Sequence, residues 1–466
     1  MVDQPLERIP QPAGSPPPYK DESGAINAET DPLLPPGHQR RHGAHRRRRL
    51  CFTFSAIVLL VLGAHVLMRH HHRHGRLPGI KYATEIDPRW TRDCVQYADW
   101  VQEASDSTSD RTSSSDHFAH VATTSFELPL SSDLLYLISR GALSHGDVHI
   151  DTAQADSDMV AVNISMSYDY ETVFEQTKVC LLQPAEGRNG VGIFSPENLH
   201  CATPNWNCTH YRTNFEVWLR IPTGLKNEIP AFVKSLETDM SLFSHRIYYL
   251  QDTVFFDSIS LKTSNSHIVS GSLAARQAVL RTSNGRISGV FNTSSSLHLG
   301  TSNAPIDVDV RMLNADNGKA TELNMRTSNS RVDAVTELIS TTSSGTNGIF
   351  KIDARTSNSP LDVSTKSAPV DHVLYFTART SNAPASASLH STWEGAFRIQ
   401  TSQHTPTVDP DTEVPDPKGK ERRRDVVVRS VRKGVVEGSA AWTPKEEHRL
   451  GEVKIRTSNA PLKLRL

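Results

Sequence analysis

Apolar and polar residues alternate along the C-terminal half of the chain in short runs that end at a recurring Thr-Ser-Asn triplet. Two and four positions before the Thr the residue is usually apolar, as in Ile259 and Leu261, Leu297 and Leu299, Leu323 and Met325, Phe397 and Ile399, and Val453 and Ile455. After the Asn the alternation restarts, as at Leu462, Leu464 and Leu466. Period two is typical of a strand with one buried face. The pattern therefore predicts two strands per repeat, with a corner at the triplet.

The triplet recurs at regular intervals, beginning at Thr263, Thr282, Thr301, Thr327, Thr356, Thr380 and Thr457, with a Thr-Ser-Gln variant at Thr401. The starts up to Thr401 are 19 to 29 residues apart, which fits one coil of a β-solenoid with loop insertions. Strand parity predicts that Thr and Asn both point inward and that each Asn stacks on the Asn of the next coil. Gly, Ala-Pro or Ser-Pro after most of the triplets fits a sharp bend. A β-sandwich with turn-rich hairpins is the alternative.

The composition favours an all-β fold for the folded part, which we expect to be a β-solenoid preceded by a β-rich cap. Repeats at residues 255–403 form the solenoid, and residues 91–254 form a membrane-proximal domain that caps its first coil. Residues 404–450 are polar and form a surface insertion before a final coil at 451–466.

The repeat region resembles a known family on the residues just described. Residues 255–403 and 451–466 are similar to the adhesin-like family of short-repeat β-solenoids, a domain of unknown function found in bacteria and in fungal membrane-anchored proteins. The shared elements are Thr-Ser-Asn, the following Gly or Ala-Pro, and an alternating strand. The resemblance implies a solenoid fold and a surface role, and it provides no catalytic residues to transfer.

An apolar segment near the N-terminus predicts a membrane anchor. Residues 50–68 contain no Asp, Glu, Lys or Arg. Their length is close to the roughly 20 apolar residues that a helix needs to cross a bilayer. Six arginines at 40–49 face three at 69–76, so positive-inside bias puts the N-terminus in the cytosol. The sequons at Asn163, Asn207 and Asn292 all follow the segment. These features predict a type II signal anchor, a spacer at 69–90, and a lumenal or extracellular C-terminus in the endomembrane system or at the plasma membrane.

The tail at residues 1–49 has few large apolar residues, so we expect it to be disordered. Pro16, Pro17, Pro18 and Tyr19 resemble the Pro-Pro-x-Tyr ligand of WW domains, such as those of ubiquitin ligases. Glu29, Leu33 and Leu34 resemble the acidic dileucine signal that clathrin adaptors read when they sort cargo to endosomes and the vacuole or lysosome. A proline-rich spacer with chance matches is the alternative.

Four cysteines follow the apolar segment, namely Cys94, Cys180, Cys201 and Cys208, and an even count there predicts two disulfides with three connectivities open. Their spacing argues against structural zinc. The histidines at 70, 71, 72 and 74 are read as a solvated spacer, with metal binding as the alternative. A net charge of −1 gives no reason to expect nucleic acid as a partner. We expect no cofactor and no metal.

A catalytic role is the main alternative to a binding or structural module. Asp307 and Asp309 alternate with apolar residues on one strand, so they share its outer face about 7 Å apart, a spacing suited to acid/base chemistry of a carbohydrate-active β-helix enzyme. Outward aspartates are also ordinary on a soluble strand, so we expect no enzyme. A trafficking receptor that recruits a WW-domain ubiquitin ligase is the third hypothesis.

The residue before each Thr is usually basic and should point outward: Lys262, Arg281, Arg326, Arg355, Arg379 and Arg456, with Gly300 and Gln400 as exceptions. Coils stack about 4.8 Å apart, so we expect these residues to form a basic column. The column either binds an anionic glycan, polymer or lipid head group, or keeps the sheet soluble with acidic neighbours that neutralise it.

The topology predicts that a glycosidase reduces the mass of the protein on a gel, because the sequons face the lumen. Protease added to intact vesicles should leave the C-terminal part intact. An unchanged mass together with digestion of the C-terminal part would show that the orientation is reversed.

Overall fold

The computed structural model describes residues 85–102, 118–197, 212–223, 230–445 and 449–466 of the 466-residue chain. All of them belong to one compact unit, residues 81–466. No helix in these ranges is long and apolar enough to cross a membrane. The expected membrane segment at 50–68 and the expected disordered tail lie outside the described residues.

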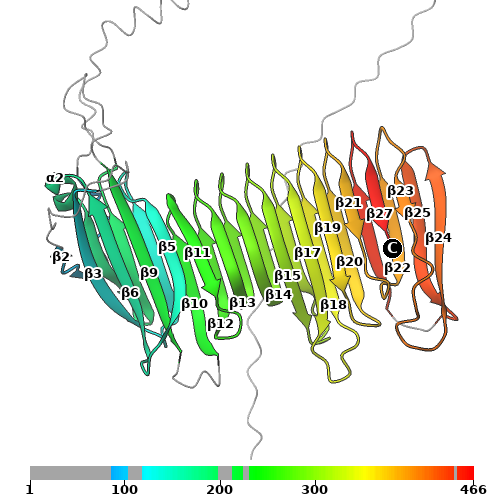
Figure 1. Ribbon diagram of the computed structural model, residues 1–466, viewed down its shortest axis with the longest axis horizontal. Helices are drawn as coiled ribbons and strands as arrows, with labels where there is room; N and C mark the ends of the chain where they lie inside the picture. The colour runs from blue at the N-terminus through cyan, green and yellow to red at the C-terminus, as the bar shows by residue number, and fades with distance from the viewer. Residues whose placement is uncertain (1–84, 103–117, 198–211, 224–229, 446–448) are drawn as a thin grey trace, which may run out of the picture. The chain divides into compact units, whose positions relative to one another are not determined.

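The described chain is all-β, with 27 strands joined in one extended sheet and a short helix α2 at Glu171–Glu175 (Figure 1). The first strands, which precede the repeats, are β1 Cys94–Tyr97, β2 Val101–Gln102, β3 His120–Pro129, β4 Leu134–Arg140, β5 Gly146–Gln154, β6 Met159–Tyr168, β7 Lys178–Ala185, β8 Arg188–Phe194, β9 Thr213–Thr223, β10 Ala231–Asp239 and β11 Phe243–Tyr249. The fold class inferred from composition is thus confirmed.

The repeats supply two strands per coil, one on each side of the triplet. Their strands are β12 Val254–Lys262, β13 Ile268–Arg281, β14 Ile287–Gly300, β15 Ile306–Asn314, β16 Thr321–Arg326, β17 Val332–Ser340, β18 Ile349–Arg355, β19 Leu361–Ser367, β20 Val373–Arg379, β21 Ala385–Ser388, β22 Gly395–Gln400, β23 Thr407–Asp409, β26 Gly451–Arg456 and β27 Leu462–Arg465. A hairpin outside the repeats, β24 Arg423–Arg432 and β25 Val435–Thr443, lies between β23 and β26 in sequence. Equivalent strands of neighbouring coils pair in parallel, for example β15 with β17 and β16 with β18. This is the stacking that a β-solenoid requires.

Alternating apolar side chains fill the space between the two strand rows. One continuous cluster of buried residues runs from Ala122 to Leu466 and includes Ile306, Val308 and Val310 of β15. Burying a side chain of this size stabilises the fold by about 1.5–3 kcal/mol. The strands before the repeats and the repeats themselves therefore share one core.

The Thr-Ser-Asn corner stacks as expected, but only the Thr points inward. Thr301 and Thr327 are buried, and their hydroxyls donate to the carbonyl oxygens of Gly285 and Ala304 in the neighbouring coil at 3.3 and 3.2 Å. The Asn side chains are exposed, so the expected inward orientation is wrong for them. The strand ends at the residue before Thr, and the triplet itself bends, so strand parity does not extend to the Asn.

The exposed asparagines form a continuous hydrogen-bonded ladder. In each step the Nδ2 of one Asn donates to the Oδ1 of the Asn in the adjacent coil at 2.7 or 2.8 Å. The ladder runs through Asn265, Asn284, Asn303, Asn329, Asn358, Asn382 and Asn459. Each internal Asn therefore both donates and accepts, which aligns every coil with its two neighbours.

The coil that is last in sequence is not last in the stack. β26 pairs in parallel with β20 on one side and β22 on the other, and β27 lies between β21 and β23. Figure 1 shows the red strand β27 between β21 and β23. In the stack, β22 and β23 lie one coil beyond β20 and β21. Residues 451–466, which form β26 and β27, occupy the position between them.

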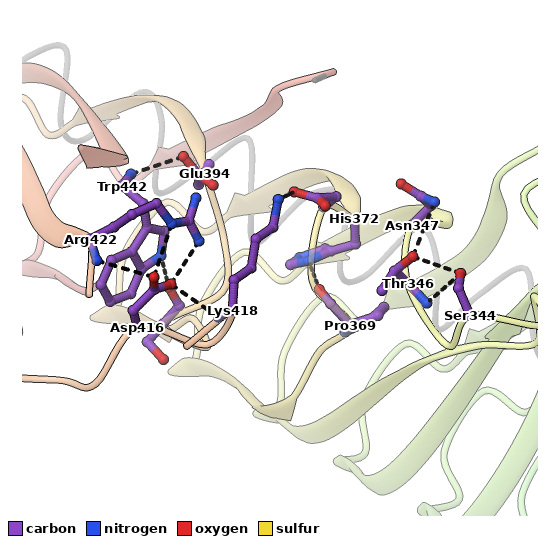
Figure 2. A network of polar contacts seen from close by, with 12 residues as sticks. Ser344, Thr346, Asn347, Pro369, His372, Glu394, Asp416, Lys418, Arg422 and Trp442 are labelled. Atoms are coloured by element: carbon purple, nitrogen blue, oxygen red, sulfur yellow. Dashed lines mark hydrogen bonds and ion pairs between the residues drawn. The ribbon is translucent and has the colours of Figure 1, made fainter. Parts of the chain in front are cut away.

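Residues 404–450, expected to be a polar surface insertion, contain β23 and the hairpin β24–β25, and β25 pairs antiparallel with β22. The loop before β24 is held by Asp416, which accepts hydrogen bonds from the Arg422 side chain and from the backbone N–H groups of Lys418 and Lys420 (Figure 2). The Arg422 guanidinium and these N–H groups hold the pKa of Asp416 well below its usual range. The segment thus covers the end of the stack.

The other end is covered in a similar way. The coil β4–β5 lies between the coil β8–β9 and the coil β10–β11, all paired in parallel. Beyond them β6 pairs antiparallel with β9, and β7 pairs antiparallel with β8. A disulfide between Cys94 and Cys180 ties β1 to β7.

We expect Asn329→Ala to lower the free energy of unfolding by about 1–3 kcal/mol, because it removes one donated and one accepted hydrogen bond, each contributing roughly 0.5–1.5 kcal/mol. Asn317→Ala is the control, since the Asn317 side chain accepts a hydrogen bond from the nearby Lys319 N–H and lies outside the ladder. Urea unfolding followed by circular dichroism measures both. Equal effects of the two substitutions would show that the ladder adds nothing.

The protein should lose stability as the pH falls from about 6.5 to about 4. His245 is fully buried 2.8 Å from Thr238 Oγ1, and burial lowers its pKa from 6.5 to about 4. Between these values the unfolded chain binds a proton that the folded chain does not, so up to roughly 3 kcal/mol is lost on acidification. His245→Gln should flatten this pH dependence in urea unfolding, whereas substitution of the exposed His404 by Gln should not. An unchanged slope in His245→Gln would contradict the assignment.

Candidate functional site: a basic column

The residues before each Thr lie in one row, as the repeat predicts. The parallel register pairs Lys262 with Arg281, Arg326 with Arg355, Arg355 with Arg379 and Arg379 with Arg456. Gly300 interrupts the row between Arg281 and Arg326, and Gln400 ends it after Arg456. All six basic side chains are exposed. We call this row the basic column.

Acidic neighbours neutralise only part of the basic column. Lys262 Nζ lies 3.3 Å from Asp239, and Arg355 is bound by Asp353 on its own strand at 2.6 Å. Arg326 donates instead to the amide oxygen of Asn324. Within the described ranges no carboxylate lies within 4.0 Å of Arg281, Arg379 or Arg456. Two of these unpaired arginines, Arg379 and Arg456, are direct neighbours in the stack.

A shallow cleft of ≈ 350 Å³ lies at the C-terminal end of the basic column. Five of its nine lining residues are basic, and the full set is Arg355, Thr377, Ala378, Arg379, Arg398, Gln400, Lys454, Ile455 and Arg456. Lys454 and Arg398 form a second row beside the column, because Lys454 pairs in register with both Thr377 and Arg398. We call this hollow the basic cleft.

The cations of the second row have acidic partners of their own. Lys454 Nζ is 2.7 Å from Glu452, and Arg398 forms an ion pair with Glu437 of the end hairpin. The sequence interpretation missed Lys454 and Arg398, since only the position before the Thr was considered. Their signal was present, because they stand three positions before Thr457 and Thr401 and strand parity points them outward with the column.

The candidate acid/base pair lies on the other strand row. Asp307 accepts from Arg286 and Arg331 at 2.7 and 3.2 Å, and the stack places Asp333 and then Asp362 beside it. Burial, followed by the negative charges of Asp307 and Asp362, raises the pKa of Asp333. Burial and the stacking of one outward carboxylate per coil together account for this shift, so it does not require a catalytic site. Asp309 is exposed on the same strand.

Two of the three predicted glycosylation sites lie within the described residues. Asn163 lies in β6 and is half-buried, and its Oδ1 accepts from Ser125 Oγ at 2.9 Å. Asn292 lies in β14, where its Oδ1 is buried and its Nδ2 donates to Gln251 Oε1 at 3.3 Å. Asn163 is therefore the more accessible of the two amides. Asn207 lies outside the described residues.

Of the predicted disulfides, the described residues show Cys94–Cys180. This pairing excludes the two connectivities in which Cys94 bonds to Cys201 or Cys208, and both of those cysteines lie outside the described residues. So do the motifs Pro16–Tyr19 and Glu29–Leu34 and the histidine run at 70–74. No group of three or more His, Cys, Asp or Glu suited to a metal ion occurs in the described part of the chain.

Comparison with known proteins adds little to this geometry. No protein-family model matches the sequence, and no curated protein matches it. A crystal structure described as a "putative cell adhesion protein" from Clostridium sporogenes is similar over 74% of this chain and 99% of its own, with 7% identity and a TM-score of 0.15. We base no conclusion on a similarity this distant.

Proposed function

We propose that the protein is a membrane-anchored, non-catalytic display protein whose stacked coils bind an anionic polymer through the basic column. The observation that supports this function is the row itself, with four arginines (Arg281, Arg326, Arg379 and Arg456) that lack a carboxylate partner among the described residues. Binding of this kind agrees with the adhesin-like role that the repeat resemblance implies. The anchor at 50–68 and a lumenal or extracellular location remain part of the proposal.

The basic column has an electrostatic cost that a binding role explains. Two unit charges about 4 Å apart repel by roughly 1 kcal/mol in water and more near a protein surface, and like charges in register destabilise a sheet. An arginine that is paired with an acid, as Arg355 is with Asp353, would keep the protein soluble equally well. Leaving Arg379 and Arg456 adjacent and unpaired favours an anionic partner that supplies the missing charge.

The tail motifs support a sorting role for the anchor. Glu29 with Leu33 and Leu34 favours delivery to the endosome and vacuole through a clathrin adaptor, and Pro16 to Tyr19 favours contact with a WW-domain protein. In this proposal the tail sets where the basic column is displayed.

The basic column predicts salt-sensitive binding of the full-length protein to heparin and to acidic cell-wall polymer. Changing Arg326, Arg355 and Arg379 together to Ser should lower the salt concentration needed for elution, because three charges leave the row. Changing Arg286, Arg311 and Arg331 to Ser is the matched control, since these three arginines are exposed, lie on the other strand row and are paired with acids.

Negligible retention of the unaltered protein, or equal retention of both triple variants, would show that the basic column serves only to keep the protein soluble.

A further inference from the structure

The basic cleft is built by coils that are adjacent in space but not in sequence. Arg379 belongs to β20, Arg456 and Lys454 belong to β26, and Arg398 belongs to β22. β26 is part of the C-terminal coil that fills the gap between β20 and β22. Without Lys454 and Arg456 of that coil, the cleft would lack two of its five cations. The C-terminal coil is thus required for the cleft to exist.

The charges in the cleft indicate which group it suits. Three of its cations, Arg355, Lys454 and Arg398, already have a carboxylate partner. Arg379 and Arg456 stand side by side in register without one among the described residues. Two neighbouring guanidinium groups offer several N–H donors in planar forks, which suits the oxygens of a tetrahedral oxyanion. Thr377 adds a hydroxyl at the same end.

We propose that the basic cleft is the principal anion site of the protein, that it takes a sulfate or phosphate ester group of an anionic polymer, and that insertion of the C-terminal coil completes it. This inference rests on the proposed function. It specifies which chemical group of the polymer binds and where on the basic column that group binds. The rest of the column provides secondary contacts for the polymer.

Ligand binding and coil insertion are then coupled. A ligand that binds only the completed cleft stabilises the state in which residues 451–466 are inserted. By the same linkage, any change that favours insertion raises affinity for the ligand by an equal factor. The apolar residues Val453, Ile455, Leu462 and Leu464, all buried, hold the coil in place in the absence of ligand.

The first test compares two double substitutions that remove the same charge from the full-length protein. Arg379→Gln with Arg456→Gln removes the two unpaired arginines of the cleft. Arg281→Gln with Arg326→Gln removes two column arginines, also without a carboxylate partner among the described residues, from outside the cleft. The probes are a heparin hexasaccharide, which carries sulfate esters, and a phosphomannan hexasaccharide, which carries phosphate esters. The probe that binds more tightly identifies the ester class.

We expect Arg379→Gln with Arg456→Gln to weaken binding of the probe that binds more tightly at least tenfold. Arg281→Gln with Arg326→Gln should weaken it less than threefold. The variant Arg379→Lys with Arg456→Lys keeps the charge but loses the planar forks, so it should fall between the unaltered protein and the Gln pair. Equal weakening by both Gln pairs overturns the cleft as principal site and leaves the proposed function standing. If neither pair weakens binding, both the inference and the proposed function fail.

The second test measures amide hydrogen exchange of residues 451–466 with and without the tighter probe. Coupling predicts slower exchange in this coil when the probe is present, and no slowing in Arg379→Gln with Arg456→Gln. Slowing of the same size in that variant, or none in the unaltered protein, overturns the coupling. Exchange in β12 serves as the internal reference because it lies at the other end of the column.

Discussion

The structure depends on parallel stacking of coils in constant register, and the Thr-Ser-Asn corner maintains it. At this corner the buried Thr hydroxyl donates to a backbone carbonyl of the neighbouring coil, and the Asn amide bonds to the next Asn. Backbone bonds between the Ser residues, such as Ser302 N to Ser283 O at 3.1 Å, complete the contact. A slip of one residue would break all three interactions and also turn the apolar side chains outward. One short motif therefore defines both the bend and the register.

Constant register has a consequence for the surface. Outward residues at the same position of each repeat form a row, whatever their charge, because each coil places its residue beside the equivalent residue of the next coil. The arginines before Thr form the basic column on one strand row, and Asp307, Asp333 and Asp362 form an acidic row on the other. In the acidic row Asp307 is paired with Arg286 and Arg331, whereas burial and repulsion raise the pKa of Asp333. In the basic column Lys262 and Arg355 have carboxylate partners, and four arginines have none among the described residues. The cleft lined by two of those four, Arg379 and Arg456, marks the column as a candidate site.

Much of this arrangement is predictable from sequence because it is local and periodic. The alternation of residues such as Ile306 and Val308 is sufficient to predict the strands, the buried face and the row that contains Arg326 and Arg355. The Asn orientation was not predictable from parity, since the strand ends before the triplet. The position of residues 451–466 in the stack was not predictable either, because any coil with this motif fits any gap. Arg398 and Lys454 were therefore not recognised as neighbours in one cleft.

The ends of such a stack pose a separate problem, because a terminal coil has unpaired backbone groups along its edge. Antiparallel strands cover both ends here, with β6 and β7 at one and β25 at the other. Near each end one coil is inserted out of sequence order, β4–β5 at one end and β26–β27 at the other, and a single coil separates it from the covering strands. An inserted coil has partners on both edges and cannot peel away from one side. The coil at residues 451–466 is therefore internal to the stack, and backbone hydrogen bonds hold it on both sides. Because Arg456 lies on that coil, the coil inserted out of sequence order places Arg456 beside Arg379, and these are two arginines of the basic column without a carboxylate partner among the described residues.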